Sequence, residues 1–277
     1  MKNPLLRLVA YSLIIVCAAF SIFPFYWMSV IATRSAAEIS SVPPAIFYGS
    51  RLLENMDKVI FNPNINFLLT LGNSFIISTV ITASMLLFSS LAGFAFARLR
   101  FRGSKVMLLF VLGSMMIPLQ LGLIPQYIII SKLDWLNDLK AVIVPGMVSA
   151  FGVFFMRQYI DAAVPNEMLE AGRIDGCSNR QLYYRLVVPT IAPAFATLGI
   201  LTFMNVWNDF LWPSVVLKSN EMLTVQLALV RLDINTYYAD KSLIMAGSVL
   251  ATLPLFLIFL FFNRQFIAGV TEGAVKG

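Results

Sequence analysis

The side chains of this sequence best placed for specific recognition lie in one polar segment, residues 164–189, between two long apolar runs. Histidine is absent, which excludes the usual zinc sites and the Ser-His-Asp and Cys-His nucleophilic arrangements. No Gly-rich Walker A loop or dinucleotide fingerprint occurs either. Glu170, Arg173 and Asp175 can instead form charge-assisted hydrogen bonds with another protein. The pattern predicts a recognition surface, with no catalytic residue, no metal site and no cofactor on this chain.

Local signals in the same segment predict two short helices joined by a sharp corner. Pro165 suits the first turn of a helix. The pair Asp175-Gly176 is a stop signal, because glycine adopts the left-handed conformation that ends many helices. Ser178 and Gln181 have the spacing of a capping box, which starts a second helix. A rigid corner set between two long apolar runs indicates a place where another protein docks.

The composition places the rest of the chain in a membrane. It is 59% hydrophobic and 12% charged, with a mean hydropathy of +0.81, and a water-soluble domain of 277 residues could not bury so much apolar surface. The fold class predicted is an all-α polytopic membrane protein with six transmembrane helices. Their expected ranges are Leu8–Ile31, Leu71–Ala97, Val106–Ile130, Leu139–Ile160, Leu186–Val206 extending toward Trp212, and Leu243–Phe262. Pro145 and Gly146 interrupt the fourth, so a bent or partly re-entrant helix also fits there.

The distribution of Lys and Arg predicts the orientation. With a cytoplasmic N-terminus, twelve of the 20 Lys and Arg residues lie in inner segments and eight in outer ones, and four of the twelve fall in the short turn Arg98–Lys105. Both termini and the corner are therefore expected on the cytoplasmic side of a multi-pass protein. Because topology accounts for the net charge of +6, the charge indicates no nucleic-acid partner.

The spacing of the corner resembles a known motif. In this segment Glu170-Ala171-Gly172 is followed after three residues by Gly176, and Gly176 is followed after nine residues by Leu186-Val187-Val188-Pro189. This spacing is similar to that of the EAA loop of ABC importer permeases. The departures are Gly172 for the second Ala, Leu186 for Ile and Val188 for Leu. The resemblance to the maltose-type carbohydrate permeases covers essentially the whole chain. It implies a type I ABC importer permease fold, one permease domain over residues 1–277 and a cytoplasmic coupling loop over residues 164–189.

In that family the loop docks in a cleft of the ATPase subunit. The resemblance therefore implies ATPase coupling by the corner, through Glu170, Ala171, Gly172, Arg173, Asp175 and Gly176. The segment from Gly269 to Gly277, within a tail expected over residues 264–277, resembles the C-terminal tail of the maltose-type permease subunit. This implies a second ATPase contact through Thr271, Glu272, Gly273 and Lys276. A frayed chain end fits the same residues.

Polar side chains at the end of the fifth expected span suit a sugar. Asn205 and Asn208 lie three apart, hence on one helical face, with Trp207 and Asp209 beside them. Amides and an aromatic ring fit sugar hydroxyls and C–H faces, and a similar element is frequent in carbohydrate permeases. The alternative is an interfacial helix end, in which Trp207 and Trp212 form an aromatic belt.

A further polar pair occurs in the third expected span. Gln120 and Gln126 lie around Pro118 and Pro125 and could also line a cavity of the substrate pathway. A helix interrupted by two prolines can equally be bent for packing.

The resemblance implies a set of partners. These are a second, homologous permease, two copies of an ABC ATPase that binds ATP and Mg²⁺, and an extracytoplasmic solute-binding protein docked over residues 214–242. Residues 34–70 are also long enough to contact an extracytoplasmic partner. The chain itself is then a non-catalytic subunit in the cell (inner) membrane of a prokaryote, importing a di- or oligosaccharide, or else glycerol-3-phosphate or a polyol. Two alternatives stay open: an ion-coupled secondary transporter, which the scarcity of intramembrane charge disfavours, and a scaffold that transports nothing.

Overall fold

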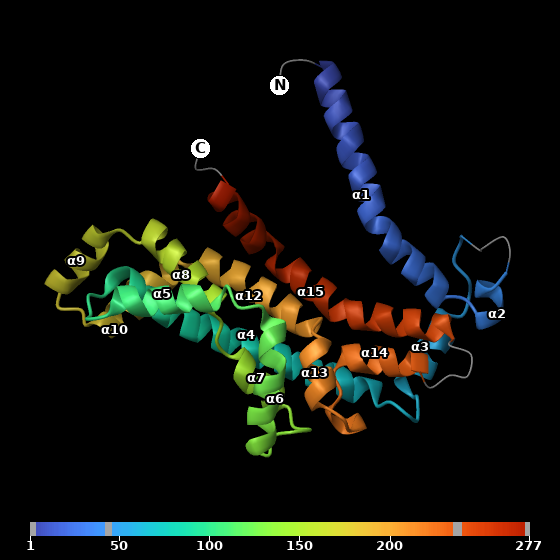
Figure 1. Cartoon of the computed structure of the whole chain (residues 1–277). Helices are drawn as coiled ribbons and strands as arrows, with labels where there is room; N and C mark the ends of the chain where they lie inside the picture. The colour runs from blue at the N-terminus through green and yellow to red at the C-terminus, as the bar shows by residue number, and fades with distance from the viewer. Residues whose placement is uncertain (1–3, 42–45, 235–239, 275–277) are drawn as a thin grey trace. The chain divides into compact units, whose positions relative to one another are not determined.

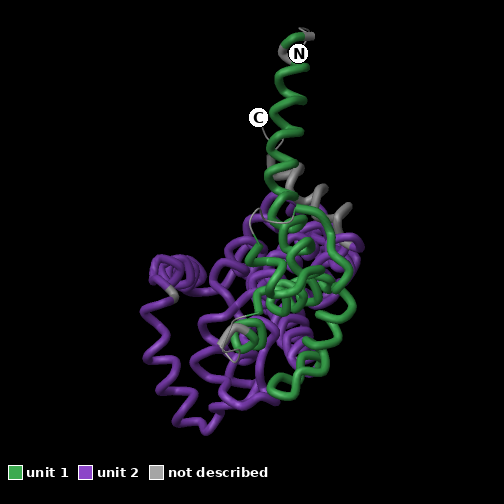
Figure 2. The backbone as a smooth tube through the Cα atoms, turned by 90° about the vertical axis from the view of Figure 1, so that its right-hand side faces the viewer, with its two compact units in different colours: residues 1–68, 228–254 green, residues 69–227, 255–277 purple. Residues whose placement is uncertain are grey.

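The structure, a computed structural model of the whole chain, describes residues 1–277 apart from 1–3, 42–45, 235–239 and 275–277. Helices are its only regular elements in the described residues (Figure 1), which confirms the predicted all-α class. The chain divides into two compact units (Figure 2). Unit 1 holds residues 1–68 and 228–254, and unit 2 holds residues 69–227 and 255–277.

Unit 1 is built around one long apolar helix. Its elements are α1 (Pro4–Ala32), α2 (Ala36–Ile39), α3 (Leu52–Ile60), most of α14 (Val225–Ile234) and the first part of α15 (Lys241–Ala274). Asn55 of α3 donates to the carbonyls of Ala32 (2.9 Å) and Arg34 (2.8 Å), which fastens α3 to the end of α1. The most apolar part of α1 is not buried within the described chain, as expected of a helix surrounded by lipid or by another membrane protein.

Unit 2 carries the polar segment and the remaining helices. These are α4 (Phe67–Arg98), α5 (Ser104–Ser114), the 3₁₀ turn η1 (Leu119–Gly122), α6 (Leu123–Lys132), α7 (Lys140–Gly146), α8 (Ala150–Ala163), α9 (Asn166–Ile174), α10 (Asn179–Leu182), the π turn η2 (Tyr183–Val187), α11 (Val188–Thr190), α12 (Ala192–Trp207), α13 (Leu211–Val216) and the 3₁₀ turn η3 (Asn220–Met222). Two buried apolar clusters hold these elements together. One joins α4, α8, α9, α10 and α12, and the other joins α4, α6, α7, α13 and α14.

The predicted count of six spans is not confirmed. Among the described residues, four helical stretches are long and apolar enough to cross a membrane: Arg7–Ala32, Phe67–Arg98, Lys140–Ala163 and Lys241–Phe261. A fifth arises only if Asn179–Thr190 and Ala192–Val216, which are bent by 75° relative to each other, are one span. Pro189 and Pro193 flank this bend, and both lack the N–H that would continue the helix.

The third expected span, Val106–Ile130, fails the test even when bent pairs are counted as one span. It is divided into α5, η1 and α6, and α5 has only 11 residues. Pro118 explains the break, because proline disfavours helical backbone in the residue before it and donates no hydrogen bond itself. In the fourth expected span α7 ends at Gly146, and α8 begins after Ser149, whose side chain accepts the N–H of Gly152 (3.3 Å).

Candidate functional site

The first half of the polar segment folds as the sequence predicts. Helix α9 ends at Ile174, and Gly176 follows in the left-handed region with φ = +80°. The N–H of Gly176 donates to the carbonyl of Arg173 (3.0 Å), and the N–H of Cys177 donates to that of Gly172 (2.9 Å). This pair of bonds is a Schellman motif, which satisfies carbonyls at the helix end and turns the chain sharply. Pro165 precedes α9 as its N-cap and does not lie in the first turn, which corrects the prediction by one residue.

The second half begins with the predicted capping box. Ser178 Oγ accepts the N–H of Gln181 (3.4 Å), and Gln181 Oε1 accepts the N–H of Ser178 (2.8 Å). After one turn the helix widens into the π turn Tyr183–Val187. Pro189 has no N–H to donate four residues back, so an altered hydrogen-bond register just before it is expected. We refer to residues 164–189 as the corner segment.

The inner face of the corner segment packs against the helices around it. Leu169, Gly172 and Leu182 are buried. A Cβ added to Gly172 would lie 2.5 Å from Leu182 Cδ2 and 3.0 Å from Leu186 Cδ1, so the ends of these leucine side chains would have to turn aside for a larger residue. Gly172 therefore faces the interior of the chain, and its predicted place in the ATPase coupling set stays a prediction.

The outer face of the corner segment holds the other residues of the predicted coupling set. Glu170, Ala171, Arg173, Asp175 and Gly176 are all exposed. Ile174, which lies among them, is 87% exposed. Beside this face lies a polar cavity of about 330 Å³ lined by Arg98, Arg100, Asn166, Leu169, Glu170 and Arg173. Charged side chains of both signs around one exposed apolar side chain are typical of a protein-docking surface.

A second cavity, which we call the polar membrane cavity, lies in the other part of unit 2. It has a volume of about 330 Å³ and is lined by Ile81, Gln120, Leu123, Gln126, Val142, Pro145, Gly146, Val206, Asp209, Leu211 and Trp212. The structure thus brings together Gln120 and Asp209, two residues of the predicted substrate pathway that are far apart in the sequence. Its size is within the range of about 300–1,000 Å³ that is usual for small-ligand pockets.

Some polar groups of this cavity hold its walls in place, and others are open to a ligand. One carboxylate oxygen of Asp209 accepts the N–H of Leu211 (3.1 Å). The indole Nε1 of Trp212 donates to the carbonyl of Ala141 (2.9 Å), which fixes the ring in the cavity wall. The side-chain amides of Gln120 and Gln126 make no hydrogen bond to another described residue. Two free amides, a carboxylate and an aromatic ring suit the hydroxyls and C–H faces of a sugar.

The structure does not place Asn205, Trp207 or Asn208 in that cavity. Trp207 is 1% exposed and stacks on Phe203, with ring centroids 5.7 Å apart. Asn208 donates to the carbonyl of Met204 (2.8 Å) and accepts from Gln226 Nε2 (3.2 Å). Asn205 is exposed but does not line the polar membrane cavity. The aromatic-belt alternative is also wrong in this chain, because Trp207 and Trp212 are both buried.

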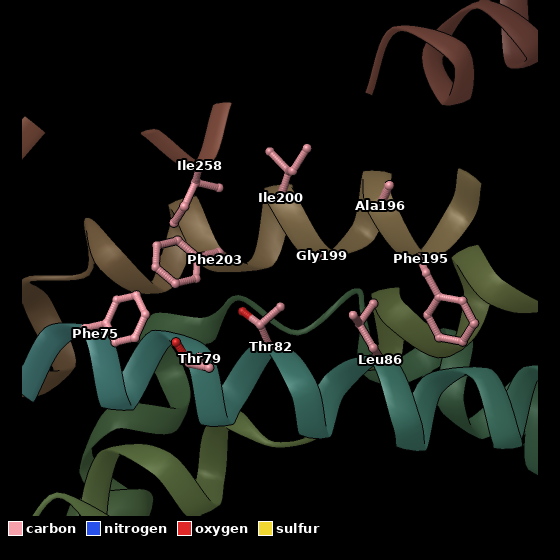
Figure 3. A pocket seen from close by; sticks show the side chains of 10 residues that line it. All are labelled: Phe75, Thr79, Thr82, Leu86, Phe195, Ala196, Gly199, Ile200, Phe203 and Ile258. Carbon is pink, nitrogen blue, oxygen red and sulfur yellow. The ribbon is translucent and has the colours of Figure 1, made fainter. Parts of the chain in front are cut away.

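A third cavity is apolar and unsuited to a sugar. It has a volume of about 290 Å³, and in Figure 3 side chains of α4 and α12 face each other across it, with Ile258 of α15 alongside. Its walls are lined by Phe75, Thr79, Thr82, Leu86, Phe195, Ala196, Gly199, Ile200, Phe203 and Ile258. The hydroxyls of Thr79 and Thr82 are the only side-chain polar groups among these residues. Hydroxyl-rich solutes would leave most of their hydrogen bonds unmade there.

Comparison with known proteins assigns the chain to a family. Residues 85–272 match the family of binding-protein-dependent transport system inner membrane components. The chain belongs to this family. It is 42% identical over 206 residues to the arabinooligosaccharides transport system permease protein AraQ of Halalkalibacterium halodurans, covering 74% of this chain and 73% of that protein. It is 33% identical over 276 residues to the lactose transport system permease protein LacG of Rhizobium radiobacter, covering 100% and 98%.

A solved structure shows the same fold. The chain superposes with a TM-score of 0.83 on a chain of a bacterial ABC transporter involved in the import of the acidic polysaccharide alginate. The match covers 96% of this chain and 99% of the other at 18% sequence identity. The chain therefore has the permease fold that the EAA spacing predicted, and the family match makes it an inner membrane component of a binding-protein-dependent transport system.

The tail of the permease is only partly described. The backbone of Thr271, Glu272 and Gly273 is helical, because α15 extends to Ala274. The side chains of these three residues, and the whole of Lys276, lie outside the described residues. The predicted tail contact with an ATPase stays a prediction. Among the described residues, no three His, Cys, Asp or Glu side chains lie close enough to hold a metal ion.

Two features of the permease site were missed in the sequence. Trp212 was considered only as half of an alternative aromatic belt, but it forms a wall of the polar membrane cavity. Arg98 was counted only as an inner charge, but its guanidinium is bound to the end of α8. No local pattern marks either role, because each depends on a partner more than 60 residues away.

Proposed function

We propose that this permease forms, together with a second homologous permease, the alternating-access pathway by which a di- or oligosaccharide is imported at the expense of ATP. The polar membrane cavity carries this proposal. It offers amide and carboxylate groups to hydroxyls, and Trp212 adds an aromatic side chain to its walls. The arabinooligosaccharide and lactose permeases to which the chain is similar support the same class of solute.

The charge of the cavity favours a sugar over glycerol-3-phosphate. Recognition of a phosphate group usually involves arginine, lysine or a helix N-terminus. The described residues that line the polar membrane cavity include the carboxylate of Asp209 and no lysine or arginine. A phosphorylated solute would meet a like charge there, which is unfavourable in a partly dry site.

ATP hydrolysis belongs, in this proposal, to two copies of a separate ABC ATPase, which bind ATP and Mg²⁺. The ATPase docks on the outer face of the corner segment through Glu170, Ala171, Arg173, Asp175 and the left-handed turn at Gly176. The exposed position of this face and its mixed charge support the assignment. The family name itself implies a solute-binding protein, which we place on the opposite side of the membrane.

The proposed orientation puts the corner segment and both chain termini in the cytoplasm of a prokaryotic cell. The polar cavity beside α9 supports this, because Arg98 and Arg100 of the arginine-rich turn line it together with Glu170 and Arg173 of the corner. The turn and the corner therefore lie on the same side of the membrane. Four Lys and Arg residues in so short a turn favour the cytoplasmic side.

Uptake by proteoliposomes tests the proposal. The purified complex of both permeases and the ATPase is reconstituted with its binding protein, and entry of radiolabelled lactose, maltose and arabinotriose is measured. We expect entry of at least one sugar that requires ATP, requires the binding protein and is blocked by vanadate. Uptake that does not require ATP and is not inhibited by vanadate, but stops when a sodium or proton gradient is collapsed, would contradict the proposal and favour an ion-coupled transporter.

A further inference from the structure

One nearly buried arginine fastens the end of α4 to the end of α8. Arg98 is the last residue of α4, and its side chain is only 9% exposed. Its Nη1 lies 3.1 Å from Oδ1 of Asp161. Its Nη2 donates to the backbone carbonyls of Asp161 (2.8 Å) and Ile160 (3.3 Å). Both carbonyls lie in the last turn of α8, at the negative end of the helix dipole. Arg98 thus caps α8 from another helix, just before the corner segment begins.

Before this contact the last turns of α4 pack closely against α8. A Cβ added to Gly93 of α4 would lie 2.8 Å from the backbone N of Arg157 and 2.9 Å from Cβ of Met156. One turn earlier, Ser89 packs directly on Gly152. Later residues of α4 contact later residues of α8, so the two helices run in the same direction and end on the same side. Such close packing resists sliding of one helix along the other.

The exit of the corner segment is attached to α4 as well. The hydroxyls of Ser90 and Tyr183 lie 2.7 Å apart and are hydrogen-bonded. Tyr183 is 3% exposed, opens the π turn and contacts the ring of Phe94, with centroids 5.6 Å apart. The last turns of α4 are therefore attached just before the corner segment, through Arg98 and the end of α8, and again in its second half, through Ser90 and Tyr183.

The same helix also reaches the polar membrane cavity. Ile81 of α4 lines that cavity, and at 1.5 Å per residue it lies roughly 25 Å along the helix from Arg98. Helix α4 has 32 residues and contains no proline, so no proline hinge separates the two places. It is a continuous element that joins the corner segment to the cavity wall.

We propose that Arg98 is a positioning residue that makes α4 and the corner segment move as one body. A displacement of α9 by a docked ATPase is then passed through the end of α8 and Arg98 to α4, and along α4 to the cavity. The planar guanidinium holds two carbonyls and one carboxylate at once, a geometry that a single ammonium group cannot reproduce. This inference rests on the proposed function, because it assigns a route for the coupling that the importer requires.

The test is the number of ATP molecules hydrolysed per sugar imported. It uses the complete complex in proteoliposomes and whichever of lactose, maltose and arabinotriose the wild-type complex imports. In Arg98→Ala we expect hydrolysis to continue while import falls, so that the ratio rises at least fivefold. Arg98→Lys keeps the positive charge but loses the planar N–H groups of the guanidinium. Its ratio of ATP hydrolysed to sugar imported is expected to rise about twofold. Arg102→Ala, an exposed arginine of the same turn, is the matched control and should keep the wild-type ratio.

The outcomes separate coupling from simple destabilisation. A variant that only loses folded protein loses hydrolysis and import in proportion, so an unchanged ratio in Arg98→Ala overturns the inference. An equal rise in Arg102→Ala overturns it too. If Arg98→Ala fails to assemble, Arg98→Lys decides, and a wild-type ratio in that variant overturns the inference. A wild-type complex that imports none of the three sugars with ATP contradicts the proposed function instead.

Discussion

Gly176 sets the geometry of the corner segment, and its replacement has a cost that follows from the structure. Its φ is +80°, and an added Cβ would meet no atom within 4 Å, so Gly176→Ala introduces backbone strain without a clash. A left-handed conformation costs an L-residue about 1–2 kcal/mol. Gly176→Asn should cost less, because asparagine visits this region more readily. Gly176→Pro excludes positive φ and removes the N–H bonded to Arg173, a loss of about 3 kcal/mol or more.

Hydrogen exchange measures this cost directly. The amide N–H groups of Gly176 and Cys177 donate within the Schellman motif, so they exchange when the turn opens. A loss of 1–2 kcal/mol raises the open population, and hence the exchange rate, about 5–30-fold. We expect this increase in the Cys177 amide of Gly176→Ala, and a smaller one in Gly176→Asn. The ATPase should bind the permease pair more weakly in the same order, with Gly176→Pro weakest.

The chain contains a matched control for this experiment. Gly103 has φ = +81°, and an added Cβ would likewise meet nothing within 4 Å, but it lies in the turn between α4 and α5. Gly103→Ala carries the same backbone strain and should leave exchange at Cys177 unchanged. The reasoning is refuted if Gly176→Ala exchanges at the wild-type rate, or if Gly103→Ala accelerates exchange in the corner segment by the same factor.

Three other variants test the polar membrane cavity and the packing of unit 2. Asp209→Asn keeps an acceptor for the Leu211 N–H but removes the charge offered to sugar hydroxyls, a loss of about 1.5 kcal/mol. ATP-driven sugar uptake at low sugar concentration should fall about tenfold, and wild-type uptake would contradict the assignment. Gly172→Ala places a Cβ 2.5 Å from the end of the Leu182 side chain, which must turn aside, while alanine favours the helix by about 1 kcal/mol. The Tm of the detergent-solubilised complex should therefore change by no more than a few degrees, and a fall of roughly ten degrees or more would show that the leucine cannot move. Asn73→Ala removes two hydrogen bonds from buried Nδ2 to carbonyls of the segment before α14, at about 1–3 kcal/mol. Its Tm should fall by several degrees, and an unchanged Tm would contradict this role.

The corner segment shows which structural features can be predicted from sequence. The stop at Gly176 and the capping box of Ser178 and Gln181 depend on residues at most a few positions apart, and both are confirmed. The inward face of Gly172 was not foreseen, because it depends on where Leu182 comes to lie after the chain has turned. Local chemistry fixes the turn, whereas packing decides which face of α9 is left for a partner.

The membrane spans show a second limit. Hydropathy identified the apolar stretches, but an apolar stretch of sufficient length need not be one helix. Pro118 was visible in the sequence and marks the break between α5 and α6. The polar membrane cavity was foreseen only in part. Gln120 and Asp209 were named as pathway residues, but nothing in their spacing showed that the turn η1 and the residues just before α13 would bring them together.

Native mass spectrometry of the complex, purified from its own membrane in mild detergent through a tag on this chain, tests the central claim most directly. The account predicts one copy of this chain, one copy of a second homologous permease and two copies of an ABC ATPase. Gly176→Pro should release the ATPase while the permease pair remains. A monomer or homodimer of this chain with no nucleotide-binding subunit would contradict the account.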